Sequence, residues 1–246
     1  MRIAVLSDIH GNLLALEAVV RHLRSRAVDA VVNLGDSLSG PLLPRETAQF
    51  LMAQGWSTIA GNHERQVLTQ PPGQWGRSDA YTRAQLSDRE LDWLAAQPPA
   101  MHFSPEVLLC HGTPESDLEP LLETFDPPRS RAATAGEVDR RLGSAAGSAV
   151  VLCGHSHVPR AVRARSGQLV VNPGSVGLPA FEGPDSGGAV VETGSPDARY
   201  AIVEQRGGKW IASLLAIPYD NHAMADLAAQ RGRPEWESAL RTGYLS

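Results

Sequence analysis

The sequence predicts an α/β fold contained in a single domain. In the first third, short β-branched runs alternate with longer runs of helical apolar spacing, which is the pattern of strand-helix-strand units. In the second half, short strand-like runs separated by Gly, Pro and Ser are typical of a β-meander. At 246 residues the chain can bury a sizeable core, so we expect one domain over residues 1–246.

The first elements follow from their apolar spacing. Residues 3–6 form an apolar run that predicts a buried strand, and apolar residues then recur at helical spacing over 13–24, with Asn12 as the N-cap. Further along we expect a strand at 30–34, a helix that begins at Pro44 and ends near residue 54, and a strand at 56–60.

The later elements are indicated by capping boxes and short apolar runs. The pairs Ser87/Glu90 and Thr134/Glu137 each predict the start of a helix. Asn221 is expected to cap a C-terminal helical extension of the domain, from about residue 221. Short strands are expected at residues 107–110, 149–153, 161–162, 169–171, 188–191, 199–203 and 210–217.

Composition and charge exclude several classes of protein. No run approaches the roughly 18 apolar residues of a membrane-spanning helix, and the first apolar stretch is too short for a signal peptide. Cys110 and Cys153 lack C-x-x-C spacing, which predicts small buried residues rather than a disulfide or thiolate site. A net charge of -5 without a Lys/Arg block argues against a dedicated nucleic-acid surface. We therefore expect a cytoplasmic protein without membrane contact.

Polar residues follow five of the expected strands, each time at the point where the strand ends. Any one of these clusters is a common turn sequence, but together they hold five of the eight histidines, each cluster beside a glycine. Because ligands bind beyond the carboxyl ends of strands in open α/β sheets, we expect the clusters to form one site. Its members are Asp8, His10, Asp36, Asn62, His63, Glu64, His111, His155 and His157.

The residue types in this set favour a metal centre. Three oxygen donors and several imidazoles suit Mn, Fe, Zn, Co or Ni better than Ca or Mg. Seven ligands are too many for one tetrahedral zinc ion, and they suit two ions that share a carboxylate. The other histidines, His22, His102 and His222, belong to no such motif and are expected to be ordinary surface or core residues.

The ordered motifs resemble those of the calcineurin-like metallophosphoesterase superfamily. They span about residues 8 to 157, and the later sequences VVNPGSVGLP (170–179) and IPYD (217–220) are similar to its compact bacterial single-domain phosphodiesterase branch. The resemblance implies a four-layer α/β/β/α sandwich of two packed mixed sheets flanked by helices. The motifs are Asp8-x-His10, Gly35-Asp36, Gly61-Asn62-His63-Glu64, His111-Gly112 and Gly154-His155-x-His157.

The resemblance also implies a role for each residue. Manganese is the expected metal, with Fe, Zn, Ni or Co as alternatives, and His63 would bind no metal. One ion would be held by Asp8, His10 and His157, the other by Asn62, His111 and His155, and Asp36 would contact both.

The implied reaction is hydrolysis of a phosphate ester. Two ions about 3.5 to 4 Å apart turn a bridging water into hydroxide, which attacks phosphorus while the ions neutralise the nonbridging oxygens. His63 is expected to be the catalytic residue that protonates the leaving oxygen. Glu64 is expected either to orient His63 or to cap the turn. Asn172 and Ser175 either shape the rim of the site or belong to a tight turn at residues 173–174.

Departures from the superfamily pattern narrow the substrate class. The arginines of protein Ser/Thr phosphatases are absent from GDSLSG (35–40) and STIAGNHE (57–64), and no tyrosine ligand like that of purple acid phosphatases follows Asp36. We expect a small phosphodiester or nucleotide substrate, although no substrate-binding residue is identified. The alternatives are a phosphomonoesterase, a dinucleoside polyphosphate hydrolase, or a noncatalytic metal- or nucleotide-binding scaffold. A nuclease acting on long DNA or RNA would require a basic groove.

Overall fold

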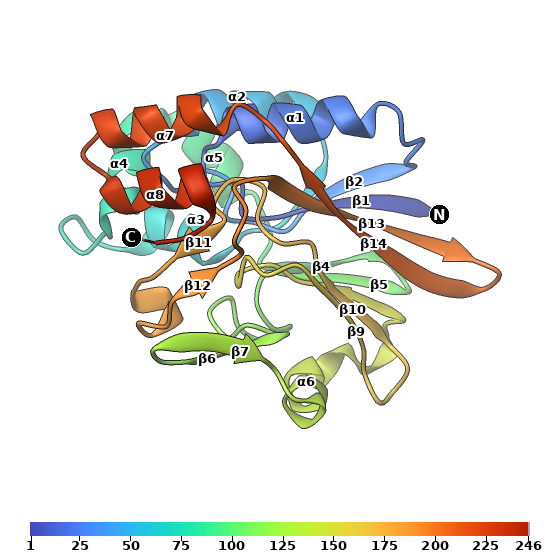
Figure 1. Ribbon diagram of the computed structural model, residues 1–246. Coiled ribbons are helices and arrows are strands. Elements are labelled where there is room, and N and C mark those ends of the chain that lie inside the picture. Colours follow the sequence, from blue (N-terminus) through green and yellow to red (C-terminus); the bar gives the residue numbers. More distant parts are fainter. Residues whose placement is uncertain (246) are drawn as a thin grey trace.

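Two five-stranded mixed sheets lie face to face in the computed structural model, which describes residues 1–245 (Figure 1). The first sheet has the order β14-β13-β1-β2-β3, and β1, β2 and β3 are parallel. Its strands are β1 (Arg2–Leu6), β2 (Ala30–Asn33), β3 (Ser57–Thr58), β13 (Ala198–Arg206) and β14 (Lys209–Ile217).

The second sheet has the order β4-β5-β8-β10-β9, and β5, β8 and β10 are parallel. Its strands are β4 (Ala100–Ser104), β5 (Val107–Cys110), β8 (Val150–Leu152), β9 (Arg160–Arg163) and β10 (Leu169–Asn172). Helices cover the outer face of each sheet, so the predicted α/β/β/α sandwich is confirmed (Figure 1).

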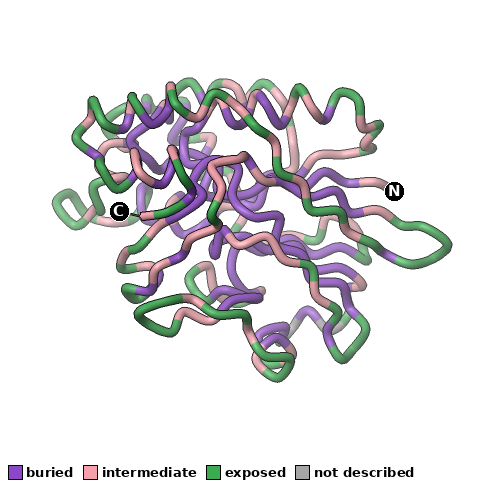
Figure 2. Tube along the Cα trace, viewed as in Figure 1, coloured by how far each residue is buried: buried purple, intermediate pink, exposed green. Residues whose placement is uncertain are grey.

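Strand β1 shows why the sheets stack. Ile3 and Val5 pack between the two sheets against residues such as Leu109 and Leu152, whereas Ala4 and Leu6 pack under the helices on the opposite face. Successive side chains of a strand point to opposite faces, so an uninterrupted apolar run fits only a strand covered on both sides. Figure 2 shows the resulting band of buried chain through the middle of the molecule.

Local sequence signals place the covering helices. Helices α1 (Leu13–Leu23), α2 (Pro44–Gln54) and α5 (Asp88–Ala95) cover the first sheet, and α6 (Ala135–Leu142) covers the second. Asn12 caps α1 as predicted, since its Oδ1 accepts a hydrogen bond of 3.2 Å from the Ala15 amide. The predicted capping box at α6 forms in both directions, whereas at α5 the Glu90 carboxylate accepts from the Ser87 amide at 2.9 Å but the Ser87 side chain accepts no bond from the helix.

Several elements differ from the sequence prediction. Strand β3 is shorter than the expected 56–60, and the last helical region begins with α7 (Asn221–Gln230), whose N-cap is Asp220 rather than Asn221. Helix α8 (Pro234–Thr242) lies within the expected C-terminal helical extension. Elements without a predicted counterpart are α3 (Asn62–Thr69), α4 (Arg77–Gln85), β4, the hairpin β6 (Glu123–Asp126) and β7 (Arg129–Ala132), and β11 (Ala180–Phe181). The expected strand at 188–191 is β12 (Val191–Glu192).

The C-terminal helices α7 and α8 pack beside the carboxyl ends of the first sheet. Trp236 and Leu240 of α8 share a core cluster with Leu42 and Leu178, which lie in loops at that edge. The helices therefore support the loops that follow β2 and β10 (Figure 1). Among residues 1–245, no helix has both the length and the apolar character needed to cross a membrane.

Substitution of Leu109 tests the packing between the two sheets. It is fully buried in the inter-sheet cluster, so Leu109→Ala is expected to lower the free energy of unfolding by about 2–5 kcal/mol, measured by urea denaturation. The matched control is Leu214→Ala on β14, where the leucine is 40% exposed and the expected change is within about 0.5 kcal/mol. Equal losses in the two variants would contradict the assignment of the core.

Candidate metal centre

The polar clusters of both sheets meet at one edge of the sandwich. Asp8 and His10 follow β1, Asp36 follows β2, and Asn62 begins α3 just after β3. The second sheet contributes residues that follow β5 and β8. Parallel strands within each sheet have their carboxyl ends on the same side, so the sheet-to-sheet stacking brings the loops together. All seven predicted ligands lie here, namely Asp8, His10, Asp36, Asn62, His111, His155 and His157.

The first group consists of Asp8, His10 and His157, whose candidate ligand atoms all lie within 4.8 Å of one another. The two Nε2 atoms of His10 and His157 are 3.1 Å apart, and Asp8 Oδ1 is 3.3 Å from His157 Nε2. These atoms face a common point, as ligands of one ion do.

The second group consists of Asp36, His111 and His155, under the same 4.8 Å limit. Asn62 joins it, because its Oδ1 lies 3.1 Å from His111 Nε2. His111 Nε2 is 3.1 Å from Asp36 Oδ2 and 3.9 Å from Asp8 Oδ1, so the two groups are adjacent.

Backbone carbonyls fix the orientation of the four imidazoles. The Nδ1 atoms of three rings lie 2.7 Å from carbonyl oxygens, His10 from Ser39, His111 from Leu34 and His157 from Leu178. The His155 ring has the opposite orientation, because its Nε2 rather than its Nδ1 lies 2.9 Å from a carbonyl oxygen, that of Leu118. Since a carbonyl can only accept, each ring donates its outer N–H and turns its other nitrogen inward, the arrangement that metal-binding histidines use.

The backbone of these loops is strained. Asp8, His10, Asp36, His155 and His157 all have φ between 52° and 66°, in the left-handed region. Side chains other than glycine avoid this region, although Asp and His tolerate it better than most. Such strain persists only where surrounding contacts impose it, and it is typical of functional sites.

Two glycines allow the loops to approach each other. A Cβ at Gly61 would lie 2.3 Å from Asp36 Oδ1, and a Cβ at Gly154 would lie 2.0 Å from Ser7 Oγ and 2.9 Å from Asp8 Oδ2. Any side chain at these positions would push the carboxylates away from the histidines, so the sequence requires glycine there.

The inward-facing atoms suit divalent cations. Asp8 Oδ1 is buried without a hydrogen-bond donor, while Asp8 Oδ2 accepts one from the His155 amide at 3.2 Å. The inward Nε2 atoms of His10 and His157 are 3.1 Å apart. Acceptors that face acceptors in a buried site need a cation between them. The mixed nitrogen and oxygen donor set fits Mn, Fe, Zn, Co or Ni.

The pKa values agree with this arrangement. Burial lowers the pKa of His10 to about 3 and that of His155 to about 4, which keeps both rings neutral as ligands must be. Burial also lowers the pKa of His111, but the Asp36 carboxylate outweighs it and raises the pKa to about 10. A positive charge at His111 Nε2, from a proton or a metal ion, therefore balances the negative charge of the carboxylate oxygens around it.

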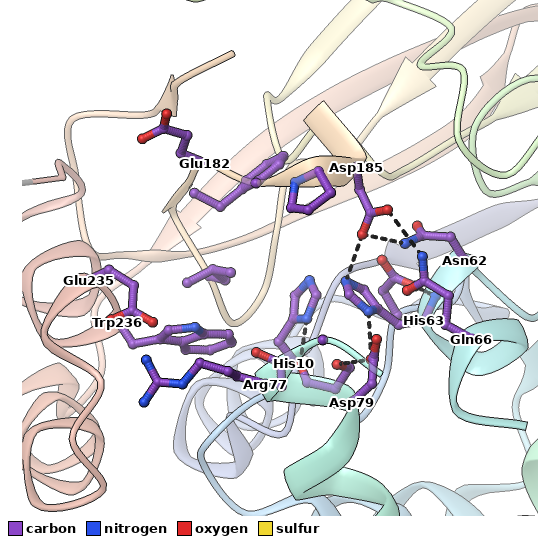
Figure 3. Close-up of a pocket in the computed structure, with 18 of the residues that line it drawn as sticks. His10, Asn62, His63, Gln66, Arg77, Asp79, Glu182, Asp185, Glu235 and Trp236 are labelled. Atoms are coloured by element: carbon purple, nitrogen blue, oxygen red, sulfur yellow. Dashed lines mark hydrogen bonds and ion pairs between the residues drawn. The ribbon is translucent and has the colours of Figure 1, made fainter. Parts of the chain in front are cut away.

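His63 lies beside the two groups and is held by a carboxylate that the sequence analysis did not identify. Its Nδ1 is 2.8 Å from Asp79 Oδ1 on α4, which also accepts a 2.6 Å hydrogen bond from Ser39 Oγ (Figure 3). Burial lowers the pKa of His63, but Asp36 and Asp79 outweigh it and raise the pKa to about 10. The ring is therefore an imidazolium whose Nε2–H faces the cavity.

Glu64 caps the turn and does not orient His63. Its carboxylate accepts 2.8 Å hydrogen bonds from the backbone amides of Asp36, Ser37 and Gly61. It thus ties the loop after β2 to the start of α3, and it leaves the His63 ring to Asp79.

Asn172 and Ser175 support the metal loops from behind. Asn172 Nδ2 donates to the Gly154 carbonyl at 2.6 Å, and Ser175 Oγ donates to the Asp8 carbonyl at 2.7 Å. Both residues are almost fully buried and neither lines the cavity. They do not shape the rim of the site.

A cavity of about 820 Å³ opens from the centre toward α4, α8 and the segment between β11 and β12. Residues that the sequence analysis did not identify line it, including Gln66, Arg77, Asp185, Arg233 and Trp236 (Figure 3). Asp79, Gln66 and Asp185 carried no recognisable signal, since each lies in a polar stretch without motif or apolar period.

Comparison with known proteins identifies the superfamily that the motifs resemble. The family model described as calcineurin-like phosphoesterase superfamily domain matches residues 1–195. The uncharacterized protein MJ0912 of Methanocaldococcus jannaschii is 23% identical over 257 residues, which cover 95% of this chain and 94% of that protein.

Two solved structures share the fold over nearly the whole length of both chains. A metallophosphoesterase from Sphaerobacter thermophilus has a TM-score of 0.73 and 23% identity, with 99% of this chain and 100% of the other covered. The hypothetical protein PH1004 from Pyrococcus horikoshii has a TM-score of 0.74 and 16% identity, with 100% and 99% covered.

Substitution of Glu64 tests whether its hydrogen bonds to backbone amides support metal binding at the centre. Glu64→Gln keeps the shape but has only one acceptor oxygen for three amides, so the loop with Asp36 loosens and Mn²⁺ affinity is expected to fall by about 10- to 100-fold. Calorimetric titration of chelator-treated protein measures this. The control is Glu17→Gln on the exposed face of α1, and an equal Mn²⁺ affinity in the two variants would argue against the role.

Proposed function

The chain belongs to the calcineurin-like phosphoesterase superfamily and is a phosphoesterase, and on that premise we propose that it hydrolyses small phosphodiesters or nucleotides with two divalent metal ions. The observation that carries the proposal is the pair of adjacent ligand groups, in which buried carboxylate oxygens and imidazole nitrogens converge. Two buried cysteines without a disulfide suit a reducing compartment, and we propose the cytoplasm.

The proposed ligand assignment follows the two groups. When bound, the two ions supply Lewis-acid chemistry, which lowers the pKa of water and neutralises charge on the nonbridging phosphate oxygens. Manganese is the proposed metal. Asp8, His10 and His157 would hold one ion, Asn62, His111 and His155 the other, and Asp36 both.

His63 is proposed as the general acid for the leaving group. Asp79 accepts the Nδ1 proton and keeps the ring charged, so Nε2–H remains available to an oxygen in the cavity. Transfer of this proton to the leaving oxygen avoids release of an alkoxide, an effect typically worth about 10²- to 10⁴-fold in rate. A noncatalytic scaffold would have no use for this His63–Asp79 pair beside the ligands.

The cavity suits a small substrate. A volume of about 820 Å³ is within the range of small-molecule sites and holds a nucleotide. The runner-up activities, phosphomonoester hydrolysis and dinucleoside polyphosphate hydrolysis, would use the same centre and differ only in what occupies the outer cavity.

Metal removal tests the proposed activity. With Mn²⁺ the protein is expected to hydrolyse bis-p-nitrophenyl phosphate, and a chelator should abolish turnover until metal is restored. Asp36→Asn should lose at least about 100-fold in kcat and bind less metal, as measured by elemental analysis, because the shared carboxylate is lost. Absence of turnover with every divalent ion tried would favour the scaffold, and full metal content with full rate in Asp36→Asn would refute the shared ligand.

His63→Ala separates acid catalysis from metal binding. The variant should keep its metal content but lose about 10²- to 10⁴-fold in kcat for esters with poor leaving groups, and much less for p-nitrophenolate, which needs no proton. Asp79→Asn should show a weaker form of the same pattern, because the ring is still present but less firmly held. A uniform loss across leaving groups would contradict the acid role.

A further inference from the structure

Asp185 places a negative charge at the outer side of the proposed metal centre. It lies in a 3-10 turn (Pro184–Ser186) between β11 and β12, and its side chain is 30% exposed and lines the cavity. Figure 3 shows its carboxylate directed toward α3, opposite His63 and Asn62.

The groups that Asp185 contacts are those that a substrate would meet. Its Oδ2 accepts a hydrogen bond from Asn62 Nδ2 at 3.4 Å and lies 3.9 Å from His63 Nε2, the atom proposed to face the leaving oxygen. Its Oδ1 accepts from Gln66 Nε2 at 3.1 Å. A phosphate ester at the centre must therefore replace or approach this carboxylate.

The His63 imidazolium offsets the Asp185 charge only in part. Within residues 1–245 its one ion-pair contact is the 3.9 Å approach of His63, and no arginine or lysine nitrogen lies within 4 Å. Asn62 and Gln66 contribute neutral amides. The carboxylate thus keeps its negative field toward the position where the phosphate oxygens of a substrate would lie.

The turn that carries Asp185 is anchored by the fully buried Ser186, whose Oγ donates a 2.7 Å hydrogen bond to the Ala189 carbonyl oxygen. Gly183, Gly187 and Gly188 flank the turn, and a Cβ added at any of them would meet no atom within 4 Å. Gly187 and Gly188 have φ of 59° and 81°, which the absence of a side chain permits. The turn thus holds the Asp185 carboxylate in a defined position, with open space beside its glycines.

We propose that Asp185 is a specificity-determining residue that disfavours dianionic phosphate groups and thereby selects phosphodiesters over phosphomonoesters. The proposal rests on the proposed phosphoesterase function. Near neutral pH a monoester carries a second negative charge, whose pKa is about 6, whereas a diester carries one. A fixed carboxylate repels the additional charge, which is selection by an unfavourable contact with the wrong substrate.

Kinetics with two matched substrates test this. Asp185→Asn keeps the shape and removes the charge, so kcat/KM for p-nitrophenyl phosphate should rise by about tenfold while that for bis-p-nitrophenyl phosphate stays within about twofold. Screening at a partly exposed site keeps the expected factor moderate. The gain should appear mainly in KM, because the charge acts on the bound ground state. Asp185→Glu, which retains the charge, should keep the wild-type ratio.

Binding provides a readout that does not need turnover. Calorimetry of inorganic phosphate with the Mn²⁺-loaded protein should give about tenfold tighter binding in Asp185→Asn than in wild type. Asp126→Asn on β6, where the side chain is 69% exposed and outside the cavity, is the control and should change neither binding nor kinetics.

The outcomes distinguish this inference from the proposed function. Equal changes of kcat/KM for monoester and diester, or unchanged phosphate affinity in Asp185→Asn, would overturn the role of Asp185. Failure of the wild-type protein to hydrolyse either ester with any divalent ion would instead refute the proposed function, and the phosphate titration would still decide the role of Asp185.

Discussion

The charge balance of two buried carboxylates governs this structure. Asp8 and Asp36 are almost completely removed from solvent at the edge where the loops of both sheets meet. Burial raises the pKa of the Asp8 carboxyl, but His157 and His111 outweigh it and hold the pKa below its ordinary value. Burial acts on Asp36 in the same way, and His111 and His63 outweigh it and lower its pKa further. Two anions this deep are stable only among cations or strong donors, and the histidines and the proposed metal ions meet that need.

The rest of the fold keeps these groups in place. Five positions with left-handed backbone would relax if the loops were free, and they are restrained from several directions. Glu64 binds three amides of the loops after β2 and β3, and Asn172 and Ser175 hold the loops after β8 and β1. Carbonyl oxygens of neighbouring loops fix the rings. Metal sites depend on this kind of support, since a displacement of a fraction of an ångström degrades ligand geometry.

Sequence reasoning succeeded where the signal is local and failed where tertiary packing decides. Strand β1 and helix α1 follow from apolar spacing and the Asn12 cap, and the proposed ligands, which the structure brings together, were identified by residue type at strand ends. Helix α4 has almost no apolar period, so neither it nor Asp79 was predicted. Glu64 was a plausible partner for His63 only by adjacency. Successive residues of a helix point in directions about 100° apart, so Glu64 faces the β2 loop while His63 faces Asp79.

The proposed metal centre and the carboxylates of the outer cavity carry charges of opposite sign. With two divalent ions bound, the centre would be cationic, whereas Glu182 and Asp185 place carboxylates in the outer cavity, where Arg233 is paired with Glu235. In a chain of net charge -5, the proposed centre supplies attraction for an anionic ester without a basic surface. In the proposed mechanism, the Asp185 carboxylate opposes a ligand in proportion to the charge of that ligand. Attraction by the centre and repulsion by Asp185 would then act on the same phosphate group, which would favour substrates with one negative charge at phosphorus.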